Sequence, residues 1–329
     1  MARVAVVLMN LGGPDSPAAV RPFLNNLFSD PAIIDLPAPL RRPLAWLIAR
    51  QRSRVAAEIY AHLGGASPLL ANTEEQARAL EAELGPDYRC FIAMRYWHPL
   101  TGAAVAAVKE WQPDEIVLLP LYPQFSLTTT KSSLAAWRDE AHRQGLVCPT
   151  RAVPAYPTEP GFIAALAGLV DCALAETTTQ KASIRLLLSA HGLPLKIVRK
   201  GDPYPQQVET TAAALVARLE RPIGDWRVCY QSRVGPLAWL GPSVEEEIRR
   251  AGRDGAAVVI APISFVSEHS ETLVELDRDY RRLAEGCGVP LYRRVPAVGT
   301  APRFIAGLAR LVREHTAETT PAEILAPAS

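Results

Sequence analysis

The sequence predicts an α/β protein made of two similar, doubly wound, Rossmann-like domains with parallel sheets. Buried apolar runs alternate with segments of helical period along most of the 329 residues, as in parallel sheets covered by helices. The pattern of strand endings also repeats. Each half has a strand ending in a glycine-containing turn with a proline, then a strand ending in a proline loop, then a strand with an internal proline. This internal repeat predicts two like units facing each other across a cleft.

The composition is that of an ordinary globular protein, with 49% hydrophobic and 21% charged residues and a formal net charge of +1. A nucleic-acid-binding protein would normally carry a basic surface, so we expect no nucleic-acid partner. The five cysteines are scattered, without the spacing of a zinc site, an iron–sulfur site or a disulfide framework, which favours a reducing cytoplasm. No uninterrupted apolar run reaches the roughly 18 residues that span a bilayer.

The first half begins with a strand over 4–9 that ends in Asn10-Leu11-Gly12-Gly13-Pro14. A glycine pair after a strand invites a dinucleotide-binding interpretation, but no third glycine follows and the proline interrupts the motif. The remaining elements of this half alternate regularly. We expect helices at 73–84, 101–110 and 132–144, and strands at 89–94, 115–119 and 153–156.

The segment 20–68 differs from this alternation. It contains a short amphipathic helix near 23–28 and then an apolar and basic helix over 40–54, in which Trp46 and Leu47 are mixed with five arginines. Such a helix can lie on an anionic membrane surface or form the lip of an apolar pocket. An ordinary amphipathic helix with its arginines in water fits the same pattern equally well.

The second half starts with a helix at 162–176, followed by strands at 184–188, 227–230 and 256–266. After the last strand the apolar period becomes helical. Glu268, Glu271 and Glu275 fall at i, i+3 and i+7 on one helix face, and an apolar face lies beside them. A final helix covers 302–314, and the tail after 316 is expected to be disordered.

Carboxylates therefore gather at the carboxyl end of a strand, where open α/β sheets bind ligands. His191 ends another strand, and we expect it to lie across from Glu271. One imidazole and one carboxylate form a sparse site that suits ferrous iron held loosely, and the further carboxylates can relay protons. The plainer alternatives are a structural histidine and a solvated, acidic helix start.

Nine motifs, in order, resemble those of the ferrochelatases, the enzymes that insert iron into protoporphyrin to make haem. They are LMNLGGP at 8–14, GGASP at 64–68, RYWHPL at 95–100, YPQFS at 122–126, SAHGLP at 189–194, GDPYP at 201–205, QSRVGP at 231–236, WLGP at 239–242 and SEHSETLVELD at 267–277. The resemblance implies the chelatase fold, two flavodoxin-like domains with the porphyrin between them.

The resemblance also implies the site residues. His191 and Glu271 would handle the metal and the protons, and Glu275 and Glu268 would continue the acidic track. The porphyrin would be met by residues of the pocket lip and the cleft wall, namely Arg52, Tyr60, Ser67, Arg95, Tyr96 and Trp239. Some family members carry a two-iron cluster on clustered cysteines, which this chain lacks, so we expect no cofactor beyond the substrate Fe²⁺.

The domains expected from these observations are 1–155, including the lip segment 20–68, and 156–300, which carries the catalytic pair. A C-terminal helix at 301–315 would return to the first domain, and 316–329 would be a tail.

The expected activity is that of a lyase: insertion of Fe²⁺ into protoporphyrin IX with release of two protons, the last step of haem biosynthesis. Asn10-Leu11-Gly12-Gly13 differs from the Tyr-Gly form of coproporphyrin-using relatives, which favours protoporphyrin IX. Two alternatives stay open, a chelatase for another metal and tetrapyrrole, and a tetrapyrrole carrier without turnover. We expect a cytoplasmic protein, with room for peripheral membrane contact through 20–68 and for contacts with proteins of the haem pathway.

Overall fold

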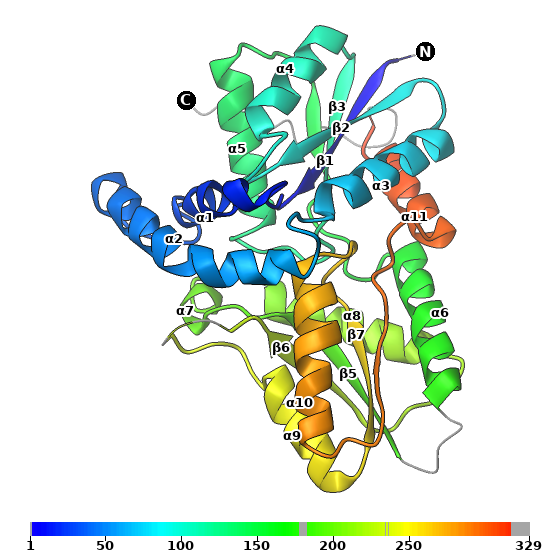
Figure 1. The fold of residues 1–329 in the computed structure, drawn as a ribbon. Helices are drawn as coiled ribbons and strands as arrows, with labels where there is room; N and C mark the ends of the chain where they lie inside the picture. Colours follow the sequence, from blue (N-terminus) through cyan, green and yellow to red (C-terminus); the bar gives the residue numbers. More distant parts are fainter. Residues whose placement is uncertain (1, 178–182, 234, 236, 317–329) are drawn as a thin grey trace. The chain divides into compact units, whose positions relative to one another are not determined.

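The computed structural model describes residues 2–177, 183–233, 235 and 237–316, and shows two compact units (Figure 1). Unit 1 comprises the chain up to Ala155 together with the chain from Ile305 onwards, and unit 2 runs from Tyr156 to Phe304. Most of the predicted tail at 316–329 lies outside the described residues.

Unit 1 is built on a parallel sheet of four strands in the order β2-β1-β3-β4. The strands are β1 (Val4–Asn10), β2 (Tyr88–Met94), β3 (Glu115–Pro120) and β4 (Thr150–Ala152). The first three match the sequence prediction, and β1 is buried along its whole length. The fourth was predicted at 153–156, which is wrong. The ladder ends at Val153, whose amide still donates to Leu118, because Pro154 has no N–H to continue it.

Three helices of unit 1 cover the sheet. These are α3 (Leu69–Leu84), α4 (Thr101–Trp111) and α5 (Thr130–Arg143). Val105, Val108 and Trp137 pack on the side chains of alternate β1 residues, among them Val7 and Met9, as expected of one face of a strand. The helix α11 (Pro302–Glu314) belongs to unit 1 from Ile305 onwards, and its Arg313 donates a 2.7 Å hydrogen bond to the carbonyl of Glu83 at the end of α3.

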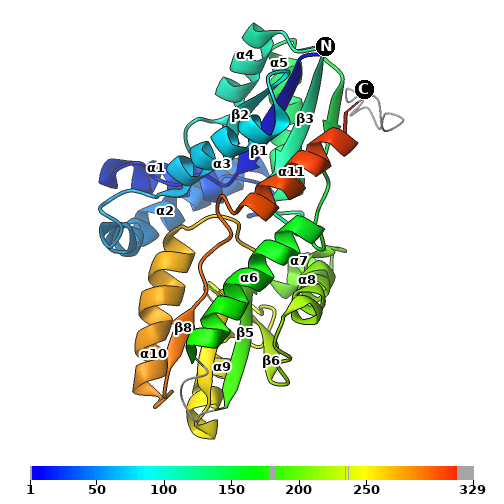
Figure 2. The same cartoon turned by 90° about the vertical axis from the view of Figure 1, so that its right-hand side faces the viewer.

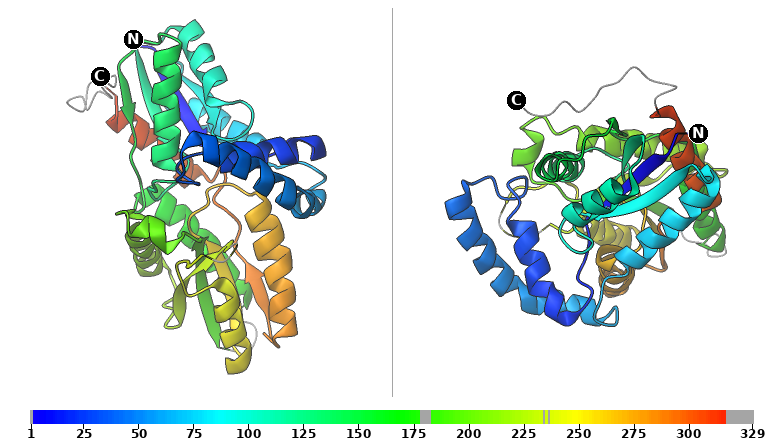
Figure 3. Two further views of the ribbon diagram at one scale, coloured as in Figure 1. Left: turned by 90° about the vertical axis from the view of Figure 1, so that its left-hand side faces the viewer. Right: turned by 90° about the horizontal axis from the view of Figure 1, so that it is seen from above.

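The segment 20–68 departs from the regular alternation of strands and helices, as the sequence predicts. The short 3₁₀ helix η1 (Pro17–Ala19) leads into α1 (Val20–Phe28), which packs against the long helix α2 (Ala38–Ala61). Both helices lie beside the strands of unit 1 rather than on a face of the sheet (Figure 3). Phe23, Leu24 and Ala49 are buried between them, whereas several apolar side chains of α2 are exposed.

Unit 2 repeats the topology of unit 1. Its sheet has the order β6-β5-β7-β8, and all its strands are parallel. They are β5 (Ile184–His191), β6 (Trp226–Gln231), β7 (Ala257–Pro262) and β8 (Tyr292–Arg294). In both units the first strand is central, the second lies on one side of it and the third on the other. The predicted pair of doubly wound parallel sheets is therefore confirmed.

Helices cover both faces of this second sheet (Figure 2). One layer holds α6 (Pro160–Thr177) and α8 (Tyr204–Arg218), and the other holds α9 (Val244–Asp254), the π-helix η2 (Glu271–Asp279) and α10 (Tyr280–Gly286). The single-turn helix α7 (Leu195–Val198) follows β5. By length and composition α6 is apolar enough to cross a membrane, but core helices pass the same test, and α6 packs on α8 and β7.

The prediction for the stretch after β7 needs a correction. We expected a strand over 256–266 and a helix carrying Glu268, but β7 ends at Pro262 and the helix η2 begins only at Glu271. The intervening residues form turns and bends. Proline cannot donate to the ladder, so the strand ends where the sequence has Pro262. Glu268 therefore lies in a loop and not on the helix face that carries Glu271 and Glu275.

The contact between α9 and the chain after α10 leaves no room for a side chain at Gly252. A Cβ at this position would lie 2.2 Å from the carbonyl oxygen of Cys287. We therefore expect Gly252→Ala to lower the free energy of unfolding by roughly 1–3 kcal/mol in urea denaturation, as overpacking does. Gly168→Ala is the control, because Gly168 lies exposed in α6 with open space around it. That change should stabilise by about 0.5–1 kcal/mol, and equal effects of the two changes would contradict the steric argument.

Candidate active site

The candidate site lies at the point of unit 2 where the strand order reverses. His191 is the last residue of β5, and Glu271 is the first residue of η2, which follows β7. β5 and β7 are neighbours in the sheet, and their successors lie on opposite sides. In open α/β sheets this switch point is where ligands bind, outside the carboxyl ends of the strands. The fold thus brings together two residues that are 80 positions apart in the sequence.

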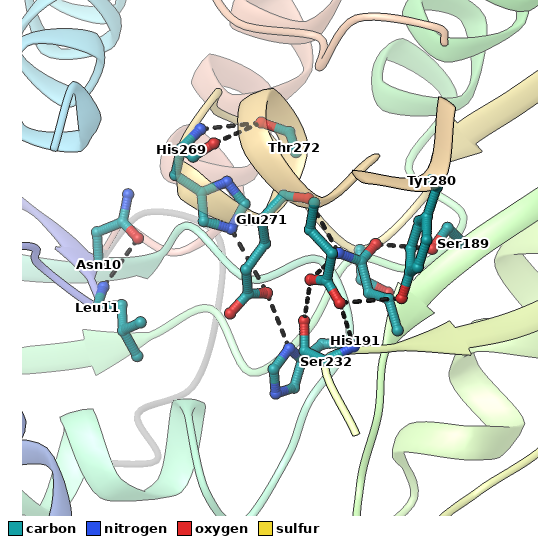
Figure 4. Close-up of polar contacts among 12 residues, drawn as sticks. Asn10, Leu11, Ser189, His191, Ser232, His269, Glu271, Thr272 and Tyr280 are labelled. Atoms are coloured by element: carbon teal, nitrogen blue, oxygen red, sulfur yellow. Dashed lines mark hydrogen bonds and ion pairs between the residues drawn. The ribbon is translucent and has the colours of Figure 1, made fainter. Parts of the chain in front are cut away.

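His191 and Glu271 form a direct polar pair. The imidazole Nδ1 lies 2.9 Å from Glu271 Oε2, and the two side chains point toward each other (Figure 4). The His191 side chain is 43% exposed and that of Glu271 is 28% exposed. With Nδ1–H donating to the carboxylate, the Nε2 atom is left as the free nitrogen of the ring. The pair thus presents one oriented nitrogen that can accept a proton or bind a metal ion.

His191 and Glu271 each stabilise the charged form of the other. Burial disfavours a charged imidazole, but Glu271, and to a smaller extent Glu275, outweigh it and raise the pKa of His191 above its ordinary value. Burial likewise disfavours a charged Glu271, but His191 and His269 outweigh it and lower the pKa of that carboxyl group. Opposite charges at hydrogen-bond distance act in this way. Each charge of the pair thus stabilises the other.

Glu275 sits beside this pair in a cradle of donors. Its Oε2 accepts from Gln231 Nε2 at 3.0 Å and from the Ser232 hydroxyl, and its Oε1 accepts from the Ser232 amide and from the Tyr280 hydroxyl, each at 2.9 Å. The same Gln231 amide donates to the backbone carbonyl of Glu271 at 3.1 Å. Burial and the charge of Glu271 nevertheless raise the pKa of Glu275. Glu271, whose pKa is lowered, and Glu275, whose pKa is raised, thus lie on one π-helix. Helices of this type are frequent at functional sites.

Ser232 holds Glu275 from a strained backbone. Its φ of +60° lies in the left-handed region, which is uncommon for residues other than glycine. This conformation points both its amide and its hydroxyl at the Glu275 carboxylate. Strain of this kind persists only where surrounding contacts stabilise it, and the two hydrogen bonds to Glu275 are such contacts.

His269 completes the surroundings of the pair. Its Nε2 lies 3.8 Å from Glu271 Oε2, and its ring lies 4.5 Å from the Phe265 ring, centroid to centroid. Phe265 also meets the His191 ring edge to face, with centroids 6.4 Å apart. This aromatic packing restricts the orientation of both imidazoles.

Glu268 belongs to a different set of contacts. Its Oε1 accepts from Arg294 at 2.8 Å and from the amide of Ala297 at 2.9 Å. This salt bridge ties the loop before η2 to the end of β8. The structure therefore brings Glu271 and Glu275 together with His191, whereas it directs Glu268 Oε1 toward Arg294.

Trp239 lies next to the end of β5. It pairs with Pro194 in an isolated antiparallel bridge, and its ring packs on Gly192, where an added Cβ would lie 3.4 Å from a ring carbon and 2.7 Å from the carbonyl oxygen of Gln231. The indole N–H is buried and has no hydrogen-bond partner within the described residues. Trp239 thus lies in unit 2 against the turn that follows β5, and its contact with the porphyrin stays a prediction.

In unit 1, Arg95 and Tyr96 are joined by a buried aspartate. Asp30 Oδ2 accepts from the Arg95 guanidinium at 2.7 Å, from the Tyr96 hydroxyl at 2.8 Å and from the Ser132 hydroxyl. Asp30 is 4% exposed and Tyr96 is 1% exposed. Tyr96 is therefore part of the core of unit 1, and the accessible member of this cluster is Arg95, whose side chain is 23% exposed.

The other three predicted porphyrin contacts also lie in unit 1. Tyr60 and Ser67 flank Gly13, where a Cβ would meet Ser67 at 2.5 Å and the Tyr60 hydroxyl at 3.9 Å. The Ser67 amide donates to the carbonyl of Pro14 at 2.7 Å, so this loop is held against the glycine pair after β1. Arg52 lies on α2 with its guanidinium over the Phe28 ring, 5.8 Å from the centroid.

No group of three or more metal-ligating side chains gathers among residues 2–177, 183–233, 235 and 237–316. All five cysteines are free, and burial raises the pKa of Cys148 to about 11. The expected absence of an iron–sulfur cluster stays a prediction.

Several residues of the site had no role in the sequence interpretation. Gln231 ends β6, a neighbour of β5, and Ser232 directly follows it, so the rule that ligands meet strand ends could have found them. Asp30 and Tyr280 were assigned no role in the site. Nothing in the sequence pattern indicated their hydrogen bonds, because the partners lie on separate elements.

Comparison with known proteins bears on the family to which the chain belongs. A family model described as Ferrochelatase matches residues 3–316. A ferrochelatase of Caulobacter vibrioides is 57% identical over 317 residues, covering 95% of this chain and 90% of the relative. A ferrochelatase of Phenylobacterium zucineum is 55% identical over 312 residues, covering 93% and 90%.

The fold has solved counterparts as well. The structure of SirB from Bacillus subtilis with Fe³⁺ has a TM-score of 0.58 and 13% sequence identity, and 96% of each chain is covered. At that identity the likeness supports the fold alone. The family model and the two relatives carry the assignment, and they show that this chain belongs to the ferrochelatase family.

Proposed function

We propose that this protein is a protoporphyrin ferrochelatase, a lyase that inserts Fe²⁺ into protoporphyrin IX and releases two protons, as the last step of haem biosynthesis. The observation that carries the proposal is the His191–Glu271 pair, with Nδ1 and Oε2 2.9 Å apart, in a chain that belongs to the ferrochelatase family. The ring nitrogen left free by this pair is the group that meets the substrates.

Metallation of a porphyrin needs a base for the two pyrrole protons and a route for the cation. Glu271 holds the His191 ring in one orientation and leaves Nε2 free to accept a pyrrole proton or to guide the iron. Glu271 supplies the counter-charge, and Glu275 is a second carboxyl group for protons leaving the site. Iron is a substrate here, held by few ligands so that it can move on to the porphyrin nitrogens.

The direct test is anaerobic incubation of the purified protein with protoporphyrin IX and Fe²⁺, following haem absorbance. Catalytic haem formation, with many turnovers per protein, is the expected result. Two alternatives have different outcomes. A chelatase for another pair would turn over only with Co²⁺, Ni²⁺ or another tetrapyrrole. A carrier would quench porphyrin fluorescence only up to the molar amount of protein.

The porphyrin contacts follow from the family resemblance. We propose Arg52, Tyr60, Ser67, Arg95 and Trp239 as porphyrin-binding residues, with Tyr96 supporting Arg95 from the core through Asp30. Protoporphyrin IX is preferred over coproporphyrin on the sequence of the loop after β1. The proposed location is the cytoplasm, where other proteins of the haem pathway are candidate partners.

We further propose that α2 lets the protein bind the surface of anionic membranes. Leu40, Leu44 and Leu47 fall at i, i+4 and i+7 and are 63%, 37% and 50% exposed. Arginines are interspersed along the same helix, and the guanidinium groups of Arg21 and Arg50 lie over the Trp46 ring. An exposed apolar row with basic neighbours is typical of helices lying in the membrane interface.

Sedimentation with vesicles of phosphatidylcholine and phosphatidylglycerol tests this membrane proposal. The double change Leu44→Glu with Leu47→Glu should reduce the bound fraction by about tenfold, because it replaces inserted apolar groups by charges that anionic lipids repel. Val147→Glu is the control, since Val147 is 97% exposed in unit 1 but lies outside α2. Equal binding of all the variants would remove α2 from any membrane contact.

A further inference from the structure

Tyr280, the first residue of α10, stands between two carboxylates. Its hydroxyl oxygen lies 2.9 Å from Glu275 Oε1 and 3.3 Å from Glu245 Oε1. Glu275 belongs to η2, beside the catalytic pair, whereas Glu245 lies in the first turn of α9. Tyr280 itself is only 4% exposed. A single buried phenol thus joins the acidic site to a carboxylate on another helix.

The two contacts of the Tyr280 hydroxyl need more hydrogens than the phenol alone supplies. A phenol has one hydrogen and can donate it to one carboxylate at a time. The second oxygen–oxygen contact is favourable only if a carboxyl group supplies a proton of its own. Glu275 suits this role, since burial and the negative charge of Glu271 raise its pKa. The trio therefore accommodates one proton beyond that of the phenol.

Within the described part of the chain, three side chains hydrogen-bond Glu275, and of these only Tyr280 leads to another titratable group. Gln231 and Ser232 connect it instead to the backbone of Glu271 and to the end of β6. Glu245 is partly exposed on α9, so a proton that reaches it can pass to water. The hydrogen bonds thus define one continuous route from Glu275 to the surface of unit 2.

We propose that Tyr280 transfers protons from Glu275 to Glu245 and so provides an exit for the protons that iron insertion releases; this inference rests on the proposed function. In one step the Glu275 carboxylic acid gives its proton to the phenol oxygen, while the phenol gives its own hydrogen to the Glu245 carboxylate. Tyr280 is neutral before and after, and rotation of its O–H bond resets it. Burial and the charges of Glu275 and Glu245 raise the pKa of Tyr280 and so disfavour a tyrosinate. The concerted step does not form one.

The test compares two buried tyrosines of the same core cluster. Tyr280→Phe removes the proposed relay, and Tyr292→Phe removes a hydroxyl that instead donates to the carbonyl of Leu276 at 2.6 Å. We expect Tyr280→Phe to lower kcat for haem formation by about tenfold or more and to raise the solvent isotope effect in D₂O. The KM values for porphyrin and Fe²⁺ should stay unchanged. Tyr292→Phe should stay within about twofold of the wild-type kcat, because it leaves the route intact.

Glu245→Gln provides an independent arm that does not depend on a core substitution. It should lower kcat as Tyr280→Phe does, and the double variant should lose no more than either single variant, because both interrupt one route. Equal kcat and isotope effects for Tyr280→Phe and Tyr292→Phe, or full activity of Glu245→Gln, would overturn the relay. A wild-type protein that forms no haem would instead overturn the proposed function, and the relay with it.

Discussion

Replacing His191 by alanine should lower the rate of iron insertion by roughly 10²- to 10⁴-fold, the contribution typical of a positioned acid–base group. Porphyrin binding, followed by fluorescence titration, should stay measurable because the remaining proposed contacts are intact. The reason is geometric. The His191 ring supplies the nitrogen atoms of the pair, and Glu271 orients this ring through the 2.9 Å contact between Oε2 and Nδ1. Initial rates of haem formation under anaerobic conditions measure the effect.

His142→Ala is the matched control for this change, because His142 is an exposed histidine of α5 and should leave the rate unchanged. A second control uses the pair itself. If His191 and Glu271 act as a unit, the double variant His191→Ala with Glu271→Gln should lose little more than His191→Ala alone. Near-normal insertion by His191→Ala would remove this histidine from the mechanism.

Replacing Asp30 by alanine should lower the free energy of unfolding of unit 1 by roughly 3–5 kcal/mol, as breaking a buried ion pair does. The change leaves the Tyr96 and Ser132 hydroxyls and the Arg95 guanidinium without the carboxylate that they share. A buried donor without an acceptor costs its full desolvation energy. Urea denaturation followed by tryptophan fluorescence measures the loss.

Asp139→Ala serves as the control, since Asp139 is exposed on the neighbouring helix α5, and surface changes of this kind stay within about 0.5 kcal/mol. Arg95→Ala combined with Asp30→Ala should cost less than the sum of the two single changes, because the groups are in direct contact. Strict additivity would contradict the shared ion pair.

The predicted strands were most accurate where burial is complete. β1 and β3 are apolar along almost their entire length, so a run of apolar residues was enough to find them. Errors arose at prolines. The strand predicted over 256–266 stops at Pro262, and the one predicted over 153–156 stops before Pro154. In both places the strand stops at or just before a proline, which has no N–H for the ladder, although the apolar run continues.

The candidate site was predicted in part. His191 and Glu271 were found because the first ends a buried strand, the second begins the helix that follows another, and both belong to motifs of the ferrochelatase family. The helix that carries Glu271 and Glu275 is a π-helix that starts later than the helical period suggests. Glu268 consequently lies in the preceding loop and pairs with Arg294. A spacing of i and i+3 indicates a shared helix face only if the helix includes both residues.

The sequence by itself determined the α/β class, the repeated order of strands, the family and the two catalytic candidates. These depend on local periodicity and on motifs, which are properties of neighbouring residues. The tertiary structure decided how Gln231, Ser232 and Tyr280 surround Glu275, and how Asp30 joins Arg95 to Tyr96. Hydrogen bonds between distant elements depend on the packing of whole helices and strands, because only packing brings their donors and acceptors within about 3 Å of each other.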